Sequence, residues 1–473
     1  MPNIKTSLIL LTMPLFFTAL HAQLESPMIK GNVCISVTKG TIACDLVLSK
    51  LPDIKNYVIR LNSGMNIHYF KDLRRGGGAL YYDMDTKDSI GSDETKAYYL
   101  HESRGNPARY IPGELEVKYL GMYPVVADSA DGYMGQDWRG NIAFNGYSVR
   151  AEGLQGDWYP VLYDMDKKKL YSEVRYDITI SCSDCSVLFV NGSSPMRAKQ
   201  AGFKSDDPRE MSIFCGEFRA SEDHGIWLLN SEMRKSDEQK LFNTATSYQA
   251  FYEKIFDIPF KGSLTFVQTS PTADPREWGF AFYSAPTTFN VATGRYGLQS
   301  MFDNDNASKN KQGMAHELAH YYFGTLLRPN GTFGHIIEEG FAEYLSYELT
   351  RSLEGERIYE ALLKQKIQGL TYFRDYQPLA LVKTENDYGN REYYLYYYAP
   401  ILFIAIRAEI GEQAMWKWLK LMVKSNGLPT GYEFLVTTFE TAVADKNLAR
   451  KIEAKYFTSS DALKNAIDEI GVN

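Results

Sequence analysis

Two histidines and a glutamate lie together in His316-Glu317-Leu318-Ala319-His320. Residues four apart share one face of a helix, so His316 and His320 can present two imidazole nitrogens to one metal ion. Glu317 lies between them in the sequence and can reach a water on that metal rather than the metal itself. A zinc centre that does hydrolysis takes three protein ligands and keeps one position for water. The motif therefore predicts a third ligand elsewhere in the chain.

A second acidic stretch, Glu338-Glu339-Gly340-Phe341-Ala342-Glu343, begins eighteen residues after His320. On a helix that starts here, Glu339 can reach the same metal, and Glu343 lies one turn further on the same face. Glu343 can then accept the free N–H of a ligating histidine, a contact that fixes the orientation of the ring. Glu338 is rotated by about 100° from Glu339, and we assign it to the helix start or to solvent. Glu339 is the predicted third ligand.

These two stretches resemble the gluzincin metallopeptidases of the aminopeptidase N type, whose pattern is HELAHQWFG followed by NEGFA. This chain reads HELAHYYFG and then EEGFAEY. The resemblance implies that His316, His320 and Glu339 bind Zn²⁺ and that Glu317 is the general base of peptide-bond hydrolysis. It also implies a thermolysin-like catalytic domain and a peptide or protein as the substrate.

A tyrosine-rich run follows further along the chain. The family has Y-x-K-G before an apolar helix that ends in E-L-G, and the apolar run here ends in Glu409-Ile410-Gly411. Counting back from that point places Tyr396 on the family's catalytic tyrosine, which donates a hydrogen bond to the oxyanion of the reaction. The lysine and glycine of the pattern are tyrosine and alanine here, so Tyr394 and Tyr397 stay open as alternatives.

The main departure from the family is at the motif that binds the amino terminus of the substrate. The aminopeptidases have G-A-M-E-N before Trp-Gly, whereas Ala273-Asp274-Pro275-Arg276-Glu277 precedes Trp278-Gly279 here. Arg276 takes the place of the amine-binding glutamate and would repel a terminal ammonium group. Glu277 can take over if the loop shifts by one residue, and a solvated loop charge is the alternative. Aminopeptidase, endopeptidase and non-catalytic binding protein therefore stay open.

Residues 1–22 have the pattern of a secretory signal peptide, with one lysine, an apolar run and small residues near Ala22. We expect cleavage before Gln23 and an exported protein, either periplasmic or secreted. A bilayer span needs about 20 apolar residues, and this run is shorter. The later apolar run at 393–406 contains tyrosines and Pro400, which favours a buried helix. No stable membrane span is expected after the signal is removed.

The charge of the chain argues against nucleic acid as a partner. Without the signal segment it carries 50 basic and 58 acidic residues, a net charge of −8, and it has no long basic block. About 450 residues remain, which is enough for two or three domains with their own cores. The sequence does not predict an oligomeric state.

Hydrophobic patterning predicts a multidomain α+β protein. Residues 23–225 contain short alternating runs separated by Gly, Asn and Asp, which is typical of a β-sandwich-like domain. The pattern then predicts an amphipathic helix over 235–256, a strand over 262–268 and an edge strand around 288–291. In this type of enzyme an edge strand pairs with the substrate backbone. We assign 226–473 to a thermolysin-like catalytic domain that becomes helical towards its end.

The five cysteines suggest two short bridges in an exported protein. Cys34 and Cys44 flank a predicted hairpin with its turn near Lys39-Gly40, so a bridge between those strands is one expectation. Cys182-Ser183-Asp184-Cys185 is a C-x-x-C without the second pair of a zinc ribbon. We favour a small structural disulfide there, with free thiols as the alternative, and this leaves Cys215 unpaired.

Overall fold

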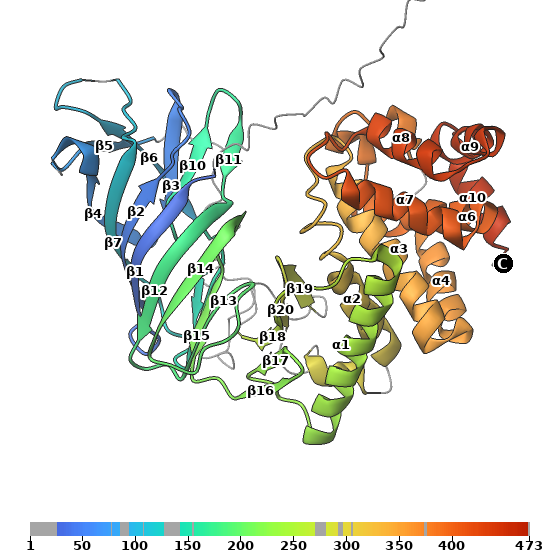
Figure 1. Cartoon of the computed structure of the whole chain (residues 1–473), viewed down its shortest axis with the longest axis horizontal. Helices are drawn as coiled ribbons and strands as arrows, with labels where there is room; N and C mark the ends of the chain where they lie inside the picture. Colours follow the sequence, from blue (N-terminus) through green and yellow to red (C-terminus); the bar gives the residue numbers. More distant parts are fainter. Residues whose placement is uncertain are drawn as a thin grey trace, which may run out of the picture.

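The computed structural model describes residues 26–76, 78–85, 94–106, 108–126, 142–153, 156–269, 281–291, 297–303, 306–372 and 376–471. The predicted signal peptide at 1–22 and the substrate-binding candidates Arg276 and Glu277 lie outside these residues. A strand-rich part forms one side of the molecule and a helical part the other (Figure 1). The predicted α+β class is confirmed, while the exact domain boundaries stay a prediction.

Three sheets form the strand-rich part. Their strands run in the orders β14-β12-β1-β2-β7-β4, β11-β10-β3-β6-β5 and β13-β15-β9-β8. The bounds are β1 (Met28–Ser36), β2 (Thr41–Ser49), β3 (Tyr57–Asn62), β4 (Met65–Asp72), β5 (Tyr81–Met84), β6 (Thr95–His101), β7 (Glu114–Met122), β8 (Ile142–Phe144), β9 (Ser148–Ala151), β10 (Val161–Asp164), β11 (Lys169–Tyr171), β12 (Val174–Cys182), β13 (Val187–Val190), β14 (Gln200–Arg209) and β15 (Ile213–Gly216). Every second residue of β2 is buried. Since successive side chains of a strand point to opposite faces, the alternating apolar pattern of β2 determines which face of the sheet packs on the core.

The predicted hairpin around Lys39-Gly40 is confirmed, but the predicted Cys34–Cys44 bridge is wrong. In the ladder between β1 and β2, Cys34 lies opposite Ala43 and Cys44 lies opposite Val33. Because neighbouring side chains of a strand point to opposite faces, this offset of one residue puts the two thiols on different sides of the sheet. Cys34 is exposed, Cys44 is buried, and both are free thiols.

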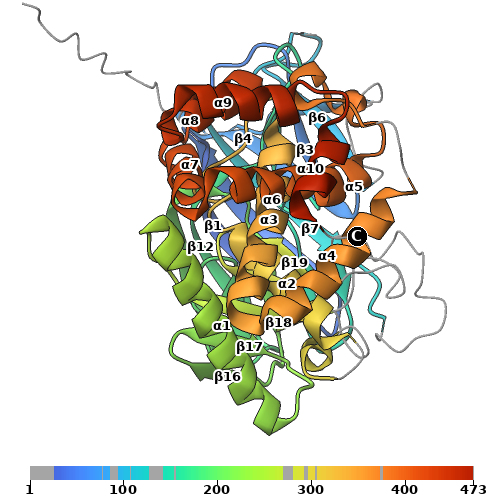
Figure 2. The same cartoon turned by 90° about the vertical axis from the view of Figure 1, so that its right-hand side faces the viewer.

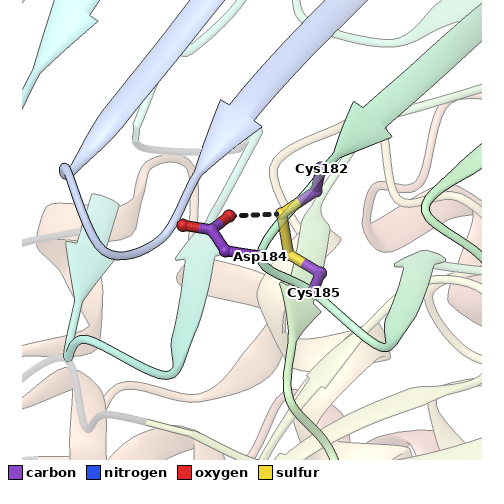
Figure 3. Close-up of side chains that lie close together, drawn as sticks. All are labelled: Cys182, Asp184 and Cys185. Carbon is purple, nitrogen blue, oxygen red and sulfur yellow. Dashed lines mark hydrogen bonds between the residues drawn. A yellow bond between two sulfur atoms is a disulfide. The ribbon is translucent and has the colours of Figure 1, made fainter.

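The favoured disulfide between Cys182 and Cys185 is present, directly after β12 (Figure 3). Asp184, between the two cysteines, reaches the turn of the β1–β2 hairpin. It accepts hydrogen bonds from the side chain of Ser36 and from the backbone and side chain of Thr38. The disulfide loop therefore ties the end of β12 to a hairpin that is far away in sequence.

A fourth sheet opens the second part of the chain. The sheet has the order β16-β17-β18-β20-β19, with β16 (Ala220–Asp223), β17 (Ile226–Leu229), β18 (Leu264–Gln268), β19 (Ala281–Ser284) and β20 (Thr288–Val291). The strand predicted around 288–291 exists as β20, but the prediction that it forms the edge is wrong. β20 pairs with β18 on one side and with β19 on the other. Within the described part of the chain the edge strand is β19, which precedes the turn at 285–287 and pairs antiparallel with the outer side of β20.

Ten helices complete the described part of the chain. They are α1 (Lys235–Phe256), α2 (Ala307–Ala319), α3 (Phe341–Leu349), α4 (Glu356–Leu370), α5 (Arg391–Tyr393), α6 (Ala399–Ile410), α7 (Glu412–Lys424), α8 (Tyr432–Ala442), α9 (Lys446–Ile452) and α10 (Ala462–Ile470). The helix predicted over 235–256 is confirmed as α1, with Leu241, Tyr248 and Tyr252 on its buried face. Seen from the helical side, α1, α4, α6 and α7 lie in front of the strands (Figure 2).

One large apolar core joins the β16–β20 sheet to the helices, and a second fills the strand-rich part. Of the run at 393–406, residues 399–406 are buried along their whole length within the first core, so the predicted buried helix is confirmed for α6. Tyr393, Tyr396 and Tyr397 are only partly buried. Among the described helices, none combines the length and apolar character that a bilayer crossing requires.

The two parts contact each other through polar groups as well. Arg328 donates to the carboxylate of Glu173 at 2.7 Å and to the carbonyl of Pro208 at 2.8 Å. Asn191, directly after β13, donates to the carbonyl of Ala285 in the β19–β20 turn. The strand-rich part therefore holds the turn that follows β19 and leads into β20.

Candidate metal centre

The helix α2 carries the H-E-x-x-H motif at its carboxyl end. Met314, Ala315 and Leu318 are buried and hold the helix against the core. Tyr252 of α1 donates a hydrogen bond to the carbonyl of Ala315 at 2.7 Å, directly before His316. The last carbonyl groups of a helix carry partial negative charge, which favours a cation at this end. Both the packing and the helix dipole therefore prepare this end of α2 for a metal ion.

The third predicted ligand comes from the segment before α3. Glu339 lies in a π-helical turn, Ile336–Gly340, that continues directly into α3. The helices α2 and α3 pack against each other, and Gln312 donates to the Ser346 hydroxyl across the contact. Glu338 lies in the same turn and is partly exposed, with its carboxylate 4.0 Å from His335 Nδ1.

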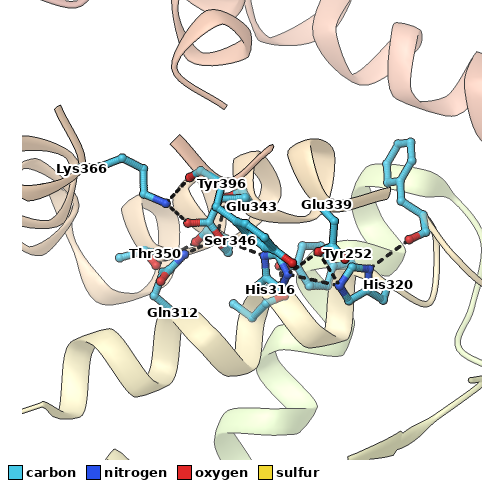
Figure 4. A network of polar contacts seen from close by, with 12 residues as sticks. Tyr252, Gln312, His316, His320, Glu339, Glu343, Ser346, Thr350, Lys366 and Tyr396 are labelled. Atoms are coloured by element: carbon cyan, nitrogen blue, oxygen red, sulfur yellow. Dashed lines mark hydrogen bonds and ion pairs between the residues drawn. The ribbon is translucent and has the colours of Figure 1, made fainter. Parts of the chain in front are cut away.

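The structure brings His316, His320 and Glu339 together (Figure 4). The two Nε2 atoms are 3.2 Å apart. The Glu339 carboxylate oxygen lies 3.3 Å from Nε2 of His316 and 3.5 Å from Nε2 of His320. Ligand atoms about 2.0–2.1 Å from a tetrahedral zinc ion lie about 3.3–3.4 Å apart. The three separations therefore match three corners of a zinc tetrahedron, with the fourth left for water or substrate.

The other ring nitrogens face acceptors. His316 Nδ1 lies 2.8 Å from a carboxylate oxygen of Glu343, and His320 Nδ1 lies 3.1 Å from the carbonyl of Phe323. An acceptor at Nδ1 keeps the proton there and leaves the lone pair of Nε2 facing the centre. Glu343 thus lies against His316, one of the predicted ligands.

Charge in the site also fits a metal cation. Burial alone would raise the pKa of Glu339, but His320 and His316 lower it to about 2. Burial would lower the pKa of His316, and the neighbouring carboxylates of Glu339 and Glu343 instead raise it to about 10. The carboxylates stabilise positive charge here, and the inward oxygen of Glu339 is buried without a hydrogen bond of good geometry. Two imidazoles and a carboxylate are a ligand set that zinc prefers, so these residues fit the ion.

Tyr396 and Glu317 lie beside the three ligands. Tyr396 is in a second π-helical turn, Tyr394–Tyr398, that runs into α6. Its hydroxyl hydrogen-bonds to Glu339, and its ring centroid is 5.7 Å from that of His316. Glu317 is partly buried next to His316, and its charge acts on both His316 and Tyr396. A base and a hydroxyl donor therefore share the metal's surroundings.

The two alternative tyrosines have other partners. The Tyr394 hydroxyl donates to the carbonyl of Gln377 at 2.7 Å, and its side chain is fully buried. The ammonium group of Lys366 lies over the Tyr397 ring, with Nζ 4.6 Å from the ring centroid. Of the three, Tyr396 is the one that the structure places against a predicted ligand.

Lys366 was missed by sequence reasoning. It lies on α4, and its ammonium group pairs with Glu343 and also donates to the main-chain carbonyl of Tyr396 (Figure 4). A lysine on an amphipathic helix has no motif around it, and the only signal was its place on the apolar side of α4, between Leu363 and Leu370. Cys182, Asp184 and Cys185 form another group with metal-ligating atoms, but the disulfide occupies both sulfurs.

Comparison with known proteins rests on structure alone. No protein-family model and no curated protein matches the chain in sequence. The solved structure of leukotriene A4 hydrolase from Saccharomyces cerevisiae is 15% identical, with a TM-score of 0.64, over 92% of this chain and 67% of that protein. An M1 zinc metallopeptidase from Deinococcus radiodurans is 13% identical, with a TM-score of 0.60, over 91% of this chain and 93% of that protein. The chain therefore has the fold of the M1 zinc metallopeptidases.

Proposed function

We propose that this chain is an exported, zinc-dependent metallopeptidase, with aminopeptidase activity as the first expectation and endopeptidase activity as the alternative. One observation carries the proposal. His316, His320 and Glu339 converge at separations that suit a tetrahedral zinc ion, with Glu317 and Tyr396 beside them. The fold of the M1 zinc metallopeptidases supports the same reaction class.

The proposed mechanism assigns one task to each residue. His316, His320 and Glu339 would hold the ion. When bound, zinc supplies a Lewis acid that activates water and polarises a carbonyl oxygen. Glu317 accepts the proton of the attacking water and then donates it to the nitrogen of the leaving amine. Tyr396 donates a hydrogen bond to the oxyanion of the tetrahedral intermediate, because burial raises the pKa of its hydroxyl and keeps it protonated.

The edge of the β16–β20 sheet supports a peptide as the substrate. Among the strands that the structure describes, β19 pairs with β20 and with no other, so its second edge can add an extended chain through backbone hydrogen bonds. A point mutant of the Deinococcus radiodurans M1 zinc metallopeptidase has been solved with Tyr-Ser-Ala, and point mutants of a two-domain M1 zinc metallopeptidase have been solved with L-tryptophan and with L-arginine. Small peptides with a free amino terminus are therefore the first substrates to try, although Arg276 in the amine-binding position favours other end recognition.

Export is the remaining part of the proposal. The signal-like pattern at 1–22 supports it, and so does the disulfide between Cys182 and Cys185, since disulfides persist in oxidising compartments. The proposed location is the periplasm or the outside of the cell, and no nucleic-acid partner is proposed.

One experiment tests reaction and end specificity together. Purified protein is incubated with one peptide library in two forms, with free and with acetylated amino termini. Products are read by mass spectrometry, with and without a zinc chelator. Loss of single amino-terminal residues from free peptides alone identifies an aminopeptidase, and internal cuts in both forms identify an endopeptidase. No chelator-sensitive cleavage in either form contradicts the proposed function.

The matched variant is Glu317→Gln, which removes the proposed base and keeps the shape of the side chain. We expect normal zinc content and loss of cleavage, because the ligands remain in place. A fully active Glu317→Gln protein would exclude Glu317 as the base. Zinc stoichiometry by metal analysis separates this outcome from simple loss of the metal.

A further inference from the structure

Lys366 is a largely buried cation that nothing in the proposed mechanism uses. Its ammonium group has two oxygen partners, a carboxylate oxygen of Glu343 and the main-chain carbonyl of Tyr396. The aromatic rings of Tyr397 and Tyr347 flank it, with centroids 4.6 and 5.3 Å from Nζ. The side chain is 10% exposed. Lys366 is therefore held by four groups from two different segments of the chain.

The first partner leads to the metal. The second oxygen of Glu343 faces His316 Nδ1 at 2.8 Å, so Lys366, Glu343 and His316 form one continuous row of contacts (Figure 4). Glu343 is buried, with one carboxylate oxygen against Lys366 and the other against His316. A buried carboxylate keeps its charge only when a cation lies beside it. Lys366 supplies that cation from the side opposite His316.

The second partner leads to the oxyanion donor. The carbonyl that Lys366 binds belongs to Tyr396 itself, in the π-helical turn Tyr394–Tyr398. A hydrogen bond to the backbone of that residue restrains the direction in which its side chain leaves the turn. The contact between Lys366 and the Tyr397 ring restrains the next residue of the same turn. The α4 residue Gly369 permits this arrangement, since a Cβ there would lie 2.6 Å from the Tyr397 ring.

We propose that Lys366 is a positioning residue that couples the two halves of the site, His316 through Glu343 and the Tyr396 hydroxyl through its own backbone. This inference rests on the peptidase function proposed above. It predicts that one cation sets both the metal affinity and the alignment of the oxyanion donor. Neither effect requires Lys366 to touch the substrate.

The principal variant is Lys366→Met, which keeps length and apolar volume but removes the charge. Changes in the outer partners of metal ligands typically cost about 10–100-fold in metal affinity or activity. We expect zinc to bind about 10–100-fold more weakly, measured by competition with a chromogenic chelator. We also expect kcat at saturating zinc to fall about 10–100-fold with KM little changed. Lys364→Met on the exposed side of α4 is the matched control and should leave both quantities unchanged.

Two double variants test the coupling. With Glu343→Gln there is no buried charge to compensate, so adding Lys366→Met should weaken zinc binding little further. With Tyr396→Phe there is no hydroxyl to align, so adding Lys366→Met should lower kcat at saturating zinc little further. Additive losses in both pairs would show that Lys366 acts independently of these residues and would overturn the proposal. Zinc affinity and kcat within threefold of the parent for Lys366→Met would overturn it as well.

Lys366→Arg and Lys366→Gln keep the proposal testable if Lys366→Met fails to fold. The arginine keeps the charge and should bind zinc more tightly than the glutamine, and the reverse order would contradict the role of the charge. The chelator competition needs no peptidase activity. If the parent protein binds zinc but cuts no peptide, the proposed function fails while the zinc arm still tests Lys366.

Discussion

Replacing Tyr396 by phenylalanine removes one hydroxyl from the centre of the site. That hydroxyl hydrogen-bonds to Glu339, and burial raises its pKa, so it is a neutral donor at any working pH. The ring still fills its place next to His316. Loss of one donor to an oxyanion typically costs 10²–10³ in kcat, or about 2.7–4 kcal/mol of transition-state stabilisation. We expect Tyr396→Phe to fall in that range.

The assay is steady-state cleavage of the best peptide from the library, with the zinc content of each preparation measured in parallel. The ligands are untouched, so zinc stoichiometry should equal that of the parent protein. The hydrogen bond is stronger in the transition state than in the bound substrate, so kcat should fall while KM changes little. A fall in kcat/KM caused by a higher KM alone would indicate a role in substrate binding instead.

Tyr394→Phe and Tyr397→Phe are the matched controls in the same turn. Tyr394→Phe removes a hydrogen bond to the Gln377 carbonyl and should cost about 1 kcal/mol of stability without loss of kcat. Tyr397→Phe keeps an aromatic ring over Lys366 and should be nearly neutral. If Tyr396→Phe keeps kcat within threefold of the parent while either control loses a hundredfold, the assignment of the oxyanion donor is wrong.

Three further predictions concern stability. Burial raises the pKa of Glu210 from 4.5 to about 7 despite a hydrogen bond from Ser172. Between these two pH values the folded protein keeps a proton on Glu210 that the unfolded chain releases. The free energy of unfolding therefore falls as the pH rises through this interval. Glu210→Gln should therefore stabilise the protein by about 1–3 kcal/mol at pH 8 and have little effect at pH 4, measured by thermal unfolding. Hydrogen bonds from the β1–β2 turn outweigh burial and lower the pKa of Asp184 from 3.8 to about 2, so its contribution is present above pH 4 and is lost towards pH 2. Asp184→Ala should cost about 1–3 kcal/mol at pH 7 in urea unfolding and little near pH 2. Asn191→Ala removes donors to the carbonyls of Glu210 and Ala285 and should cost about 2–3 kcal/mol in urea unfolding. It should also raise KM more than it lowers kcat, because Ala285 directly follows β19.

The elements that could be predicted from the sequence are those whose spacing follows from chemistry. Two histidines on the same helix can share a zinc ion only if they lie about one helical turn apart, and His316 and His320 have that spacing. The helix α1 could also be predicted, because an apolar face repeated at helical spacing over 22 residues excludes a strand. Glu339 and Glu343 could be assigned to the site because a second helix that begins after the first motif limits which carboxylates can reach the two histidines.

The errors come from relations between segments that are distant in sequence. A hairpin between Cys34 and Cys44 was predictable, but the register was not, and an offset of one residue separates the thiols. β20 has the composition of a strand, yet only the path of the chain after β19 decides which strand is the edge. Lys366 lies outside every recognised motif, and its proposed role depends on how α4 packs against the turn at 394–398.

The two π-helical turns explain why residue types alone do not define this site. Glu339 and Tyr396 both lie in such turns, and each turn continues without a break into an α-helix, α3 or α6. A π turn holds one residue more than an α turn, so it changes the phase between side chains before and after it by about 100°. Deleting one residue from either turn would restore the α spacing and rotate Glu339 away from α2, or Tyr396 away from Glu339, if the following helix keeps its packing. A chain with every motif residue but regular helices here would therefore assemble an incomplete centre, and the backbone phase is as much a part of the site as its ligands.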